Sequence, residues 1–254
     1  MPRSARKESQ SGIYHIVLRG INRQQIFEDD EDYEKFLQVL MDCKRLSGFR
    51  CYAYCLMGNH IHLLLQSGRE PFGQVFRRIG ARYVYWYNWK YGRNGHLFQD
   101  RYKSMAVEND AYMLSALRYI HQNPVKAGLT KDINSYKWSS AMAYLMGGNS
   151  LVDARCVLLL FSENPTEQIE TYTEYMQGHD DIGYLEGESV KRLNDKEARE
   201  AMKLICGVST VVGFQAIPSD KRGVVLKEMH KQGISIRQIA RLTGISVGFV
   251  RKEL

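Results

Sequence analysis

Two histidines separated by one residue, His60 and His62, follow a Gly58-Asn59 pair within residues 54–66. The residues on either side of this pair are strand formers, so the stretch predicts two strands joined by a tight turn. Alternate side chains of a strand share a face, so both imidazoles are expected on the same side of the second strand. Because histidine is the commonest metal ligand in proteins, the pair predicts half of a metal site.

A tyrosine and an asparagine four residues apart, Tyr119 and Asn123, stand directly before Pro124. Proline disfavours helical geometry in the residue before it, so both side chains are expected in the last turn of a helix. Residues four apart lie on one helix face, so a phenolic nucleophile and an oxygen ligand would arrive together. Gln122 is the competing third ligand, and Tyr112, two turns earlier, is the alternative nucleophile.

These two stretches resemble the HUH single-tyrosine nucleases, in which a His-hydrophobic-His strand and a helical tyrosine cut single-stranded DNA. The similarity is closer to the REP-associated tyrosine transposases of bacteria. Further blocks that carry the resemblance are Tyr14 to Arg23, Gly95 to Ser104, and Trp138-Ser139-Ser140. The blocks occur in the right order and cover roughly residues 12–145, a little over half of the chain.

The resemblance implies a metal-dependent endonuclease and strand transferase. It implies Mg²⁺ or Mn²⁺ held by His60, His62 and Asn123, and it implies Tyr119 as the nucleophile that forms a covalent 5′-phosphotyrosine. The expected substrates are repetitive palindromic hairpins with adjacent single-stranded DNA. Asn123 is preferred to Gln122 because the family motif has an asparagine before its proline.

Two other interpretations remain open from the residues. A zinc protein would use Cys51, Cys55, His60 and His62, because thiolates and imidazoles favour zinc, although the chain has no Cys-x-x-Cys pair. The second alternative is a sequence-specific DNA-binding regulator with a relict nuclease site.

The hydrophobic patterns predict an α+β fold followed by helices. Strand signals at residues 13–18, 49–56, 60–66 and 102–107 alternate with helical signals at 32–46, 71–91 and 110–122. The order β-α-β-β-α-β is that of a ferredoxin-like sandwich with the first and third strands central. We expect a catalytic domain at 1–146, a helical connector at 147–193 and an all-α domain at 194–254.

The last segment resembles a helix-turn-helix. Ala240 would let two helices approach, Gly244 would form the turn, and a second helix over 246–254 would enter a DNA major groove. The residues expected to contact DNA here are Arg237, Ser246, Arg251 and Lys252. A three-helix packing module that does not bind DNA is the alternative.

The charge distribution supports two DNA-binding regions. Net charge is +8 over residues 1–152, −8 over 153–190, +2 over 191–218 and +5 over 219–254. Basic blocks of this kind are typical of polyanion-binding modules. In the first block the candidates are Arg77, Arg78, Arg82, Arg101 and Lys103, with Tyr85 and Trp89 as stacking residues.

Five cysteines, an odd number, argue against a disulfide framework and favour a reducing compartment. The first ten residues have no apolar run behind them, and no stretch approaches the roughly 20 apolar residues of a membrane span. We therefore expect a cytoplasmic protein with single-stranded, hairpin and duplex DNA as partners. A second copy of the chain is a further candidate partner.

Overall fold

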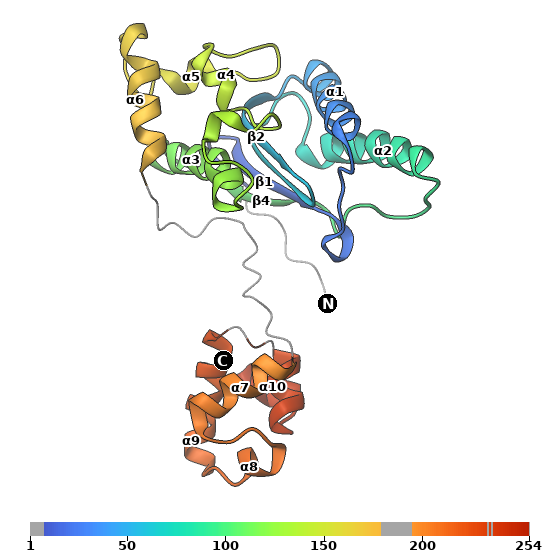
Figure 1. The fold of residues 1–254 in the computed structure, drawn as a ribbon, viewed down its shortest axis with the longest axis vertical. Coiled ribbons are helices and arrows are strands. Elements are labelled where there is room, and N and C mark those ends of the chain that lie inside the picture. The colour runs from blue at the N-terminus through green and yellow to red at the C-terminus, as the bar shows by residue number, and fades with distance from the viewer. Residues whose placement is uncertain (1–7, 179–194, 233, 235, 254) are drawn as a thin grey trace. The chain divides into compact units, whose positions relative to one another are not determined.

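The computed structural model describes residues 8–178 and 195–253, apart from residues 233 and 235. The chain divides into two compact units, residues 1–185 and residues 186–254 (Figure 1). The first unit contains a sheet with helices on both faces, and the described part of the second unit is helical.

Four antiparallel strands form the sheet of the first unit, in the order β2-β3-β1-β4. The strands are β1 (Ile13–Arg19), β2 (Arg50–Met57), β3 (His60–Gln66) and β4 (Lys103–Ala106). β1 and β3 are central, which confirms the predicted ferredoxin-like arrangement. Their register places Val17 opposite His62 and Arg19 opposite His60. Directly opposite residues share a face, so β1 contributes to the face that carries the histidines.

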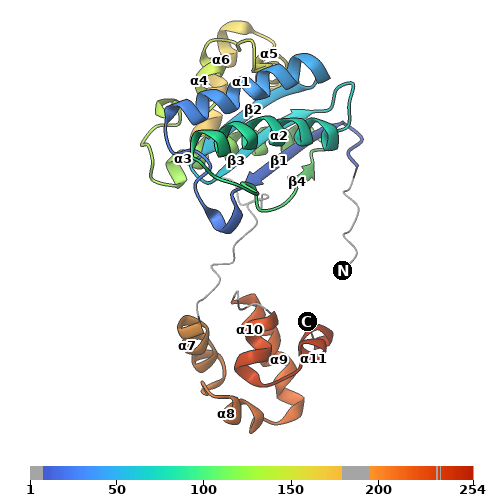
Figure 2. The same ribbon diagram turned by 90° about the vertical axis from the view of Figure 1, so that its right-hand side faces the viewer.

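Helices cover both faces of this sheet (Figures 1 and 2). α1 (Asp30–Ser47) and α2 (Phe72–Lys90) lie on one face, and α3 (Asp110–Lys126) lies on the other. A sheet covered on both sides explains why β2 and β3 are buried along almost their whole length. α1 begins at a capping box formed by Asp29 and Asp32, and it ends at Gly48, whose φ of 66° favours glycine.

The helix α3 does not end before Pro124, so the prediction of a helix over 110–122 was too short. It continues to Lys126 with Pro124 inside it. Proline removes one backbone donor, but the N–H of Ala127 still bonds to the carbonyl oxygen of Asn123 and closes the following turn. Asn123 therefore lies within the helix, one turn after the candidate nucleophile.

Two helices extend the first unit beyond the boundary predicted near residue 147. After α4 (Ala141–Leu145), which lies before that boundary, the chain forms α5 (Ala154–Leu158) and α6 (Pro165–Gln177). Tyr172 and Met176 of α6 are buried in the same hydrophobic core as the sheet. The structure thus differs from the predicted 147–193 connector, because apolar side chains of this segment complete the core of the first unit.

The second unit has its own small core. Its helices are α7 (Asp195–Cys206), α8 (Val211–Gln215), α9 (Ser219–Lys231), α10 (Ile236–Thr243) and α11 (Val247–Glu253). Ile239 and Val250 are fully buried in that core, and Gly244 makes the turn between α10 and α11 with a φ of 70°. The helix pair lies where it was predicted, while its DNA-binding role stays a prediction. Residues 179–194, which include the end of the predicted 147–193 connector, lie outside the described part of the chain.

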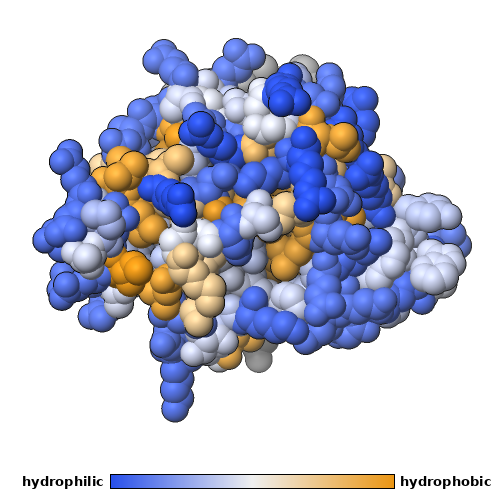
Figure 3. Space-filling model, turned by 90° about the horizontal axis from the view of Figure 1, so that it is seen from above, coloured by the Kyte–Doolittle hydropathy of each residue, from blue (hydrophilic) through white to orange (hydrophobic). Residues whose placement is uncertain are grey.

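The described surface of the first unit is mixed in character. Figure 3 shows a face on which hydrophilic side chains separate smaller apolar patches. Met146, Leu159 and Ile169 are among the exposed apolar residues. Scattered apolar side chains are ordinary on protein surfaces, so they indicate no particular partner. Within the described ranges, no helix is long and apolar enough to cross a membrane.

Candidate active site

The two histidines of β3 lie on the same face of the sheet, as predicted. Their ring centroids are 4.9 Å apart, with His60 half-buried at the start of the strand and His62 fully buried. His60 Nδ1 donates a hydrogen bond to Asn59 Oδ1 at 2.6 Å. A bonded Nδ1 fixes the orientation of an imidazole and leaves its Nε2 as the metal-binding nitrogen.

Tyr119 of α3 packs directly against this face. Its ring centroid lies 5.5 Å from that of His62, edge to face, and the side chain is only 7% exposed. The amino group of Lys126 lies 5.2 Å from the centre of the Tyr119 ring. Because the hydroxyl oxygen of Tyr119 is buried, a phosphate can reach it only if the tyrosine side chain or the end of α3 shifts outward.

A third histidine, His15 of β1, completes the buried cluster and was not singled out from the sequence. Its Nε2 lies 3.1 Å from Nδ1 of His62, and the two rings are stacked with centroids 5.3 Å apart. The His15 ring also contacts Tyr119 at 5.8 Å. Strand alternation places His15 on the same face as Val17. The pairing of Val17 with His62 depends on a register that the sequence does not reveal.

Burial sets the protonation of these histidines. Desolvation lowers the pKa of His15 to about 3 and holds the pKa of His62 well below its ordinary value, with His15, His60 and Arg19 adding smaller unfavourable charge interactions. Both rings are therefore neutral near pH 7, so one donates and the other accepts in the hydrogen bond between them.

The donor set fits a divalent metal ion. His62 Nε2 is buried and makes no hydrogen bond to any residue that the structure describes. A buried polar atom in this state is costly unless a ligand satisfies it, and a neutral imidazole nitrogen is a good metal ligand. Where His62 donates through Nδ1 to His15, its Nε2 carries the lone pair that a metal requires.

The two candidates for the third ligand point in different directions. The side-chain amide of Gln122 donates to the carbonyl oxygens of Met176 and Gly178, both at 2.8 Å, and so fastens α3 to the end of α6. Asn123 is buried, and its Nδ2 donates to the carbonyl oxygen of Tyr119 at 3.0 Å. Asn123 therefore lies on the side of the helix that carries the tyrosine, while Gln122 is engaged elsewhere.

The alternative zinc set is not assembled. No group of three or more histidine, cysteine, aspartate or glutamate residues in the described part of the chain could hold a metal ion. Burial raises the pKa of the Cys51 thiol to about 12 and also raises the pKa of the Cys55 thiol.

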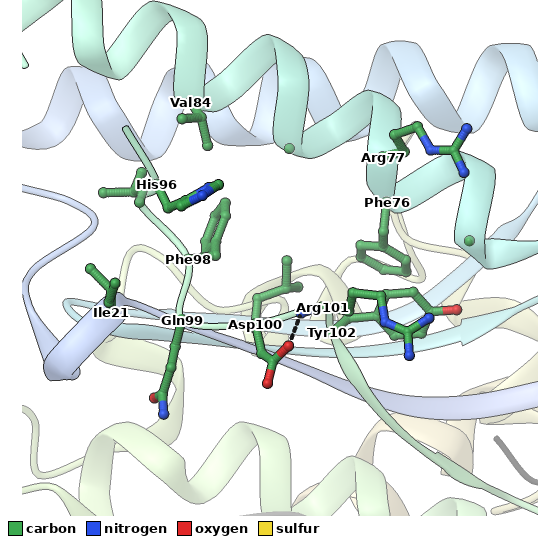
Figure 4. A pocket seen from close by; sticks show the side chains of 14 residues that line it. Ile21, Phe76, Arg77, Val84, His96, Phe98, Gln99, Asp100, Arg101 and Tyr102 are labelled. Carbon is green, nitrogen blue, oxygen red and sulfur yellow. Dashed lines mark hydrogen bonds between the residues drawn. The ribbon is translucent and has the colours of Figure 1, made fainter. Parts of the chain in front are cut away.

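The basic residues predicted to bind DNA do not form one surface on α2. Arg78 pairs with Glu70 at 3.0 Å and donates to Ser47, so it is committed within the fold. Arg77 lines a cavity beside residues 96–102 (Figure 4), and Arg82 lines a separate groove between α1 and α2. That groove also contains the strongly exposed Tyr85 and Trp89, and Arg101 and Lys103 are exposed as well.

In the second unit, Ser246, Arg251 and Lys252 are exposed, as predicted for the second helix of the pair. Ser246 caps α11, because its hydroxyl accepts a hydrogen bond from the N–H of Phe249 at 3.2 Å. The side chain of Arg237 lies outside the described part of the chain.

The structure thus brings together a histidine pair on a central strand of a ferredoxin-like sheet and a helical tyrosine, which is the arrangement expected from the resemblance to the HUH single-tyrosine nucleases. Residues 8–123 match the profile of the family described as "Transposase IS200 like". The match covers a little under half of the chain, and it makes this part similar to the IS200-like transposases.

One of two similar solved structures shares the fold. A REP-associated tyrosine transposase bound to a REP hairpin is similar with a TM-score of 0.53 and 18% identity, over 74% of this chain and 98% of that one. A candidate transposase from Deinococcus radiodurans R1 is similar with a TM-score of 0.34 and 17% identity, over 48% and 97%. Comparison with curated proteins found no match. The first similarity supports the four-stranded antiparallel sheet with helices and the helical region that follows.

Proposed function

We propose that the protein is a tyrosine transposase that cleaves and rejoins single-stranded DNA through a covalent intermediate on Tyr119. The observation that carries the proposal is the packing of the Tyr119 ring against His62, at 5.5 Å between centroids. Palindromic hairpins with an adjacent single strand are the proposed substrates. The structural similarity to a transposase bound to a REP hairpin supports this choice.

His60, His62 and the side-chain oxygen of Asn123 would hold the metal ion, Mg²⁺ or Mn²⁺. When bound, the ion would offset negative charge on the scissile phosphate. His15 would keep the His62 ring in place through the 3.1 Å hydrogen bond between them. The burial of His62 would exclude water from that side of the site.

Tyr119 supplies the nucleophile. A bond forms between its hydroxyl oxygen and phosphorus, and the bond between phosphorus and the 3′ oxygen breaks. The phenol loses its proton and the 3′ oxygen gains one, leaving a 5′-phosphotyrosine and a free 3′-hydroxyl. Attack by a 3′-hydroxyl on the phosphotyrosine reverses these steps and rejoins DNA.

Tyr119→Phe tests the proposal, with Tyr112→Phe as the matched control on the same helix. Tyr112 contacts Met105 on β4. We expect Tyr119→Phe to lower formation of a covalent protein–oligonucleotide adduct by about 10⁴-fold or more, because only the nucleophile is lost. Hairpin binding should change little. Denaturing gels and fluorescence anisotropy measure the two properties.

Other results would replace the proposal. An adduct that persists in Tyr119→Phe and disappears in Tyr112→Phe would move the nucleophile to Tyr112. Hairpin binding by wild-type protein that forms no adduct with Mg²⁺ or Mn²⁺ would favour the regulator with a relict nuclease site.

A further inference from the structure

A cavity of about 580 Å³ lies between α2 and the segment of residues 96–102 that precedes β4 (Figure 4). Its volume falls within the range of roughly 300–1,000 Å³ that is typical of ligand sites. Phe76 and Phe98 point into it, together with His96. The Phe76 ring packs on Tyr102 with centroids 4.5 Å apart, so the wall is aromatic.

The rim of this cavity is positively charged. Arg77 from α2 and Arg101 from the 96–102 segment both line the cavity and are both exposed. The one carboxylate of the lining, Asp100, accepts a hydrogen bond from the backbone N–H of Arg101 at 3.1 Å. An aromatic wall between two guanidinium groups matches a nucleotide, because its base stacks on rings and its phosphates attract arginine.

We propose that this cavity binds an unpaired base of the single-stranded DNA that passes the active site. The inference rests on the proposed function for its substrate. It adds a second contact point, on the other face of the sheet from the histidines.

Two glycines in α2 support a ligand site. Gly73 and Gly80 both line the cavity, and a Cβ added at either position would meet no atom within 4 Å. Glycine inside a helix destabilises it by roughly 0.5–1 kcal/mol relative to alanine, and no neighbour among the described residues excludes a side chain at these two positions. The glycines instead keep the cavity open along the helix.

Backbone contacts connect the cavity to the strand pair that carries His60. The N–H of Gln99 bonds to the carbonyl oxygen of Arg19 at 2.8 Å, and Arg19 stands opposite His60 in the sheet. The preceding residue of β1, Leu18, lines the cavity from the opposite face of the sheet. The side chain of Gln99 points away from the cavity (Figure 4). Single-stranded DNA that extends from His60 therefore needs to cross only the 96–102 segment to place a base in the cavity.

Filling the cavity tests this proposal. Gly80→Leu, and Gly73→Leu as a second variant, would occupy the space without a clash at Cβ, while Gln74→Leu places the same side chain at an exposed position on the same helix. All are made in the Tyr119→Phe background so that cleavage does not enter. The probes are a 12-nucleotide single strand of mixed sequence and an all-abasic strand of equal length, measured by fluorescence anisotropy at one salt concentration.

We expect Gly80→Leu and Gly73→Leu to weaken binding of the base-bearing strand about tenfold, which is the size of one lost stacking contact. Binding of the abasic strand should stay unchanged, because its phosphate contacts remain. Gln74→Leu should affect neither probe. Equal affinity of the wild-type and the cavity-filled proteins for the base-bearing strand would overturn the base site and leave the assignment of Tyr119 untouched. Loss of binding to both probes would show that the variants disturb the fold or a phosphate path, and would also overturn it.

Discussion

At the scale of single residues, the role of His15 can be tested separately from the roles of His60 and His62. In His15→Phe, a ring still fills the buried space, but the hydrogen bond to His62 Nδ1 is lost. In His15→Gln, an amide can replace that hydrogen bond. Because partners of ligating histidines typically change metal affinity by about 10–100-fold, we expect His15→Phe to weaken Mn²⁺ binding about tenfold or more.

Calorimetric titration with Mn²⁺, without DNA, measures this effect. His15→Gln should recover most of the affinity. His15→Phe should also lower the free energy of unfolding, by about 1–3 kcal/mol, because Nδ1 of His62 stays buried without its partner. The titrations are therefore made under conditions in which all variants are folded. Wild-type Mn²⁺ affinity in His15→Phe would show that His15 only fills space.

Asn123 and Gln122 give a second prediction at this scale. Asn123→Ala should reduce metal-dependent cleavage, in the same direction as His60→Ala and His62→Ala but less severely, because two imidazole ligands remain. Gln122→Ala should keep the metal dependence, because its amide binds the carbonyl oxygens of Met176 and Gly178 instead. Cleavage measured against Mn²⁺ concentration distinguishes the two variants. A loss of metal dependence in Gln122→Ala alone would reverse the assignment of the third ligand.

At the scale of elements, the sequence predicted the sheet well because its signals are local. The alternating pattern and the Gly58-Asn59 turn placed β3 at its observed bounds, and the order of elements then implied that β1 and β3 are central. The contact between His15 and His62 could not be predicted, because it depends on strand register and on the rotation of two buried rings. The end of α3 was predicted too early. Proline disfavours helical geometry in the residue before it, but the rest of α3 overrides this local preference at Pro124.

The segment after residue 147 shows the same limit. Gly147-Gly148-Asn149-Ser150 has the composition of a linker, yet Tyr172 further along is buried and its hydroxyl lies 2.9 Å from Nδ1 of His121 on α3. Composition describes the chain locally, whereas this contact joins residues far apart in sequence. The linker composition therefore marks a loop inside the first unit.

Truncation tests whether the segment after residue 147 is part of the first unit. A chain that ends after residue 146 loses the burial of Tyr172 and Met176, along with the hydroxyl that faces His121. Each such side chain stabilises the fold by about 1.5–3 kcal/mol, so the loss of these two alone should destabilise the shorter chain by about 3–6 kcal/mol. A chain that ends after residue 185 should keep the stability of the first unit. Urea unfolding of the two chains compares them, and equal midpoints would restore the boundary at 147.

At the scale of the whole molecule, the second unit is expected to add affinity for duplex DNA. The candidate catalytic residues His60, His62, Tyr119 and Asn123 all lie within residues 1–185, and residues 219–254 carry a net charge of +5. Removing residues 186–254 should therefore preserve cleavage of short single strands.

The contribution of α11 to duplex binding is tested by replacing Arg251 and Lys252 with alanine. Replacement of Lys227 and Lys231 by alanine is the charge-matched control, because it removes the same charge from α9 instead of α11.

The truncated chain should bind duplex DNA more weakly and with a flatter salt dependence. Each lost phosphate contact lowers the slope of log affinity against log salt concentration by about one, because one fewer counterion is released. Arg251→Ala with Lys252→Ala should reproduce part of this change, and Lys227→Ala with Lys231→Ala should change the slope less. Anisotropy titrations of a duplex at several salt concentrations measure the slopes. If the truncated and full chains bind duplex equally at every salt concentration, the second unit serves packing or protein contact, and target choice then rests on the first unit.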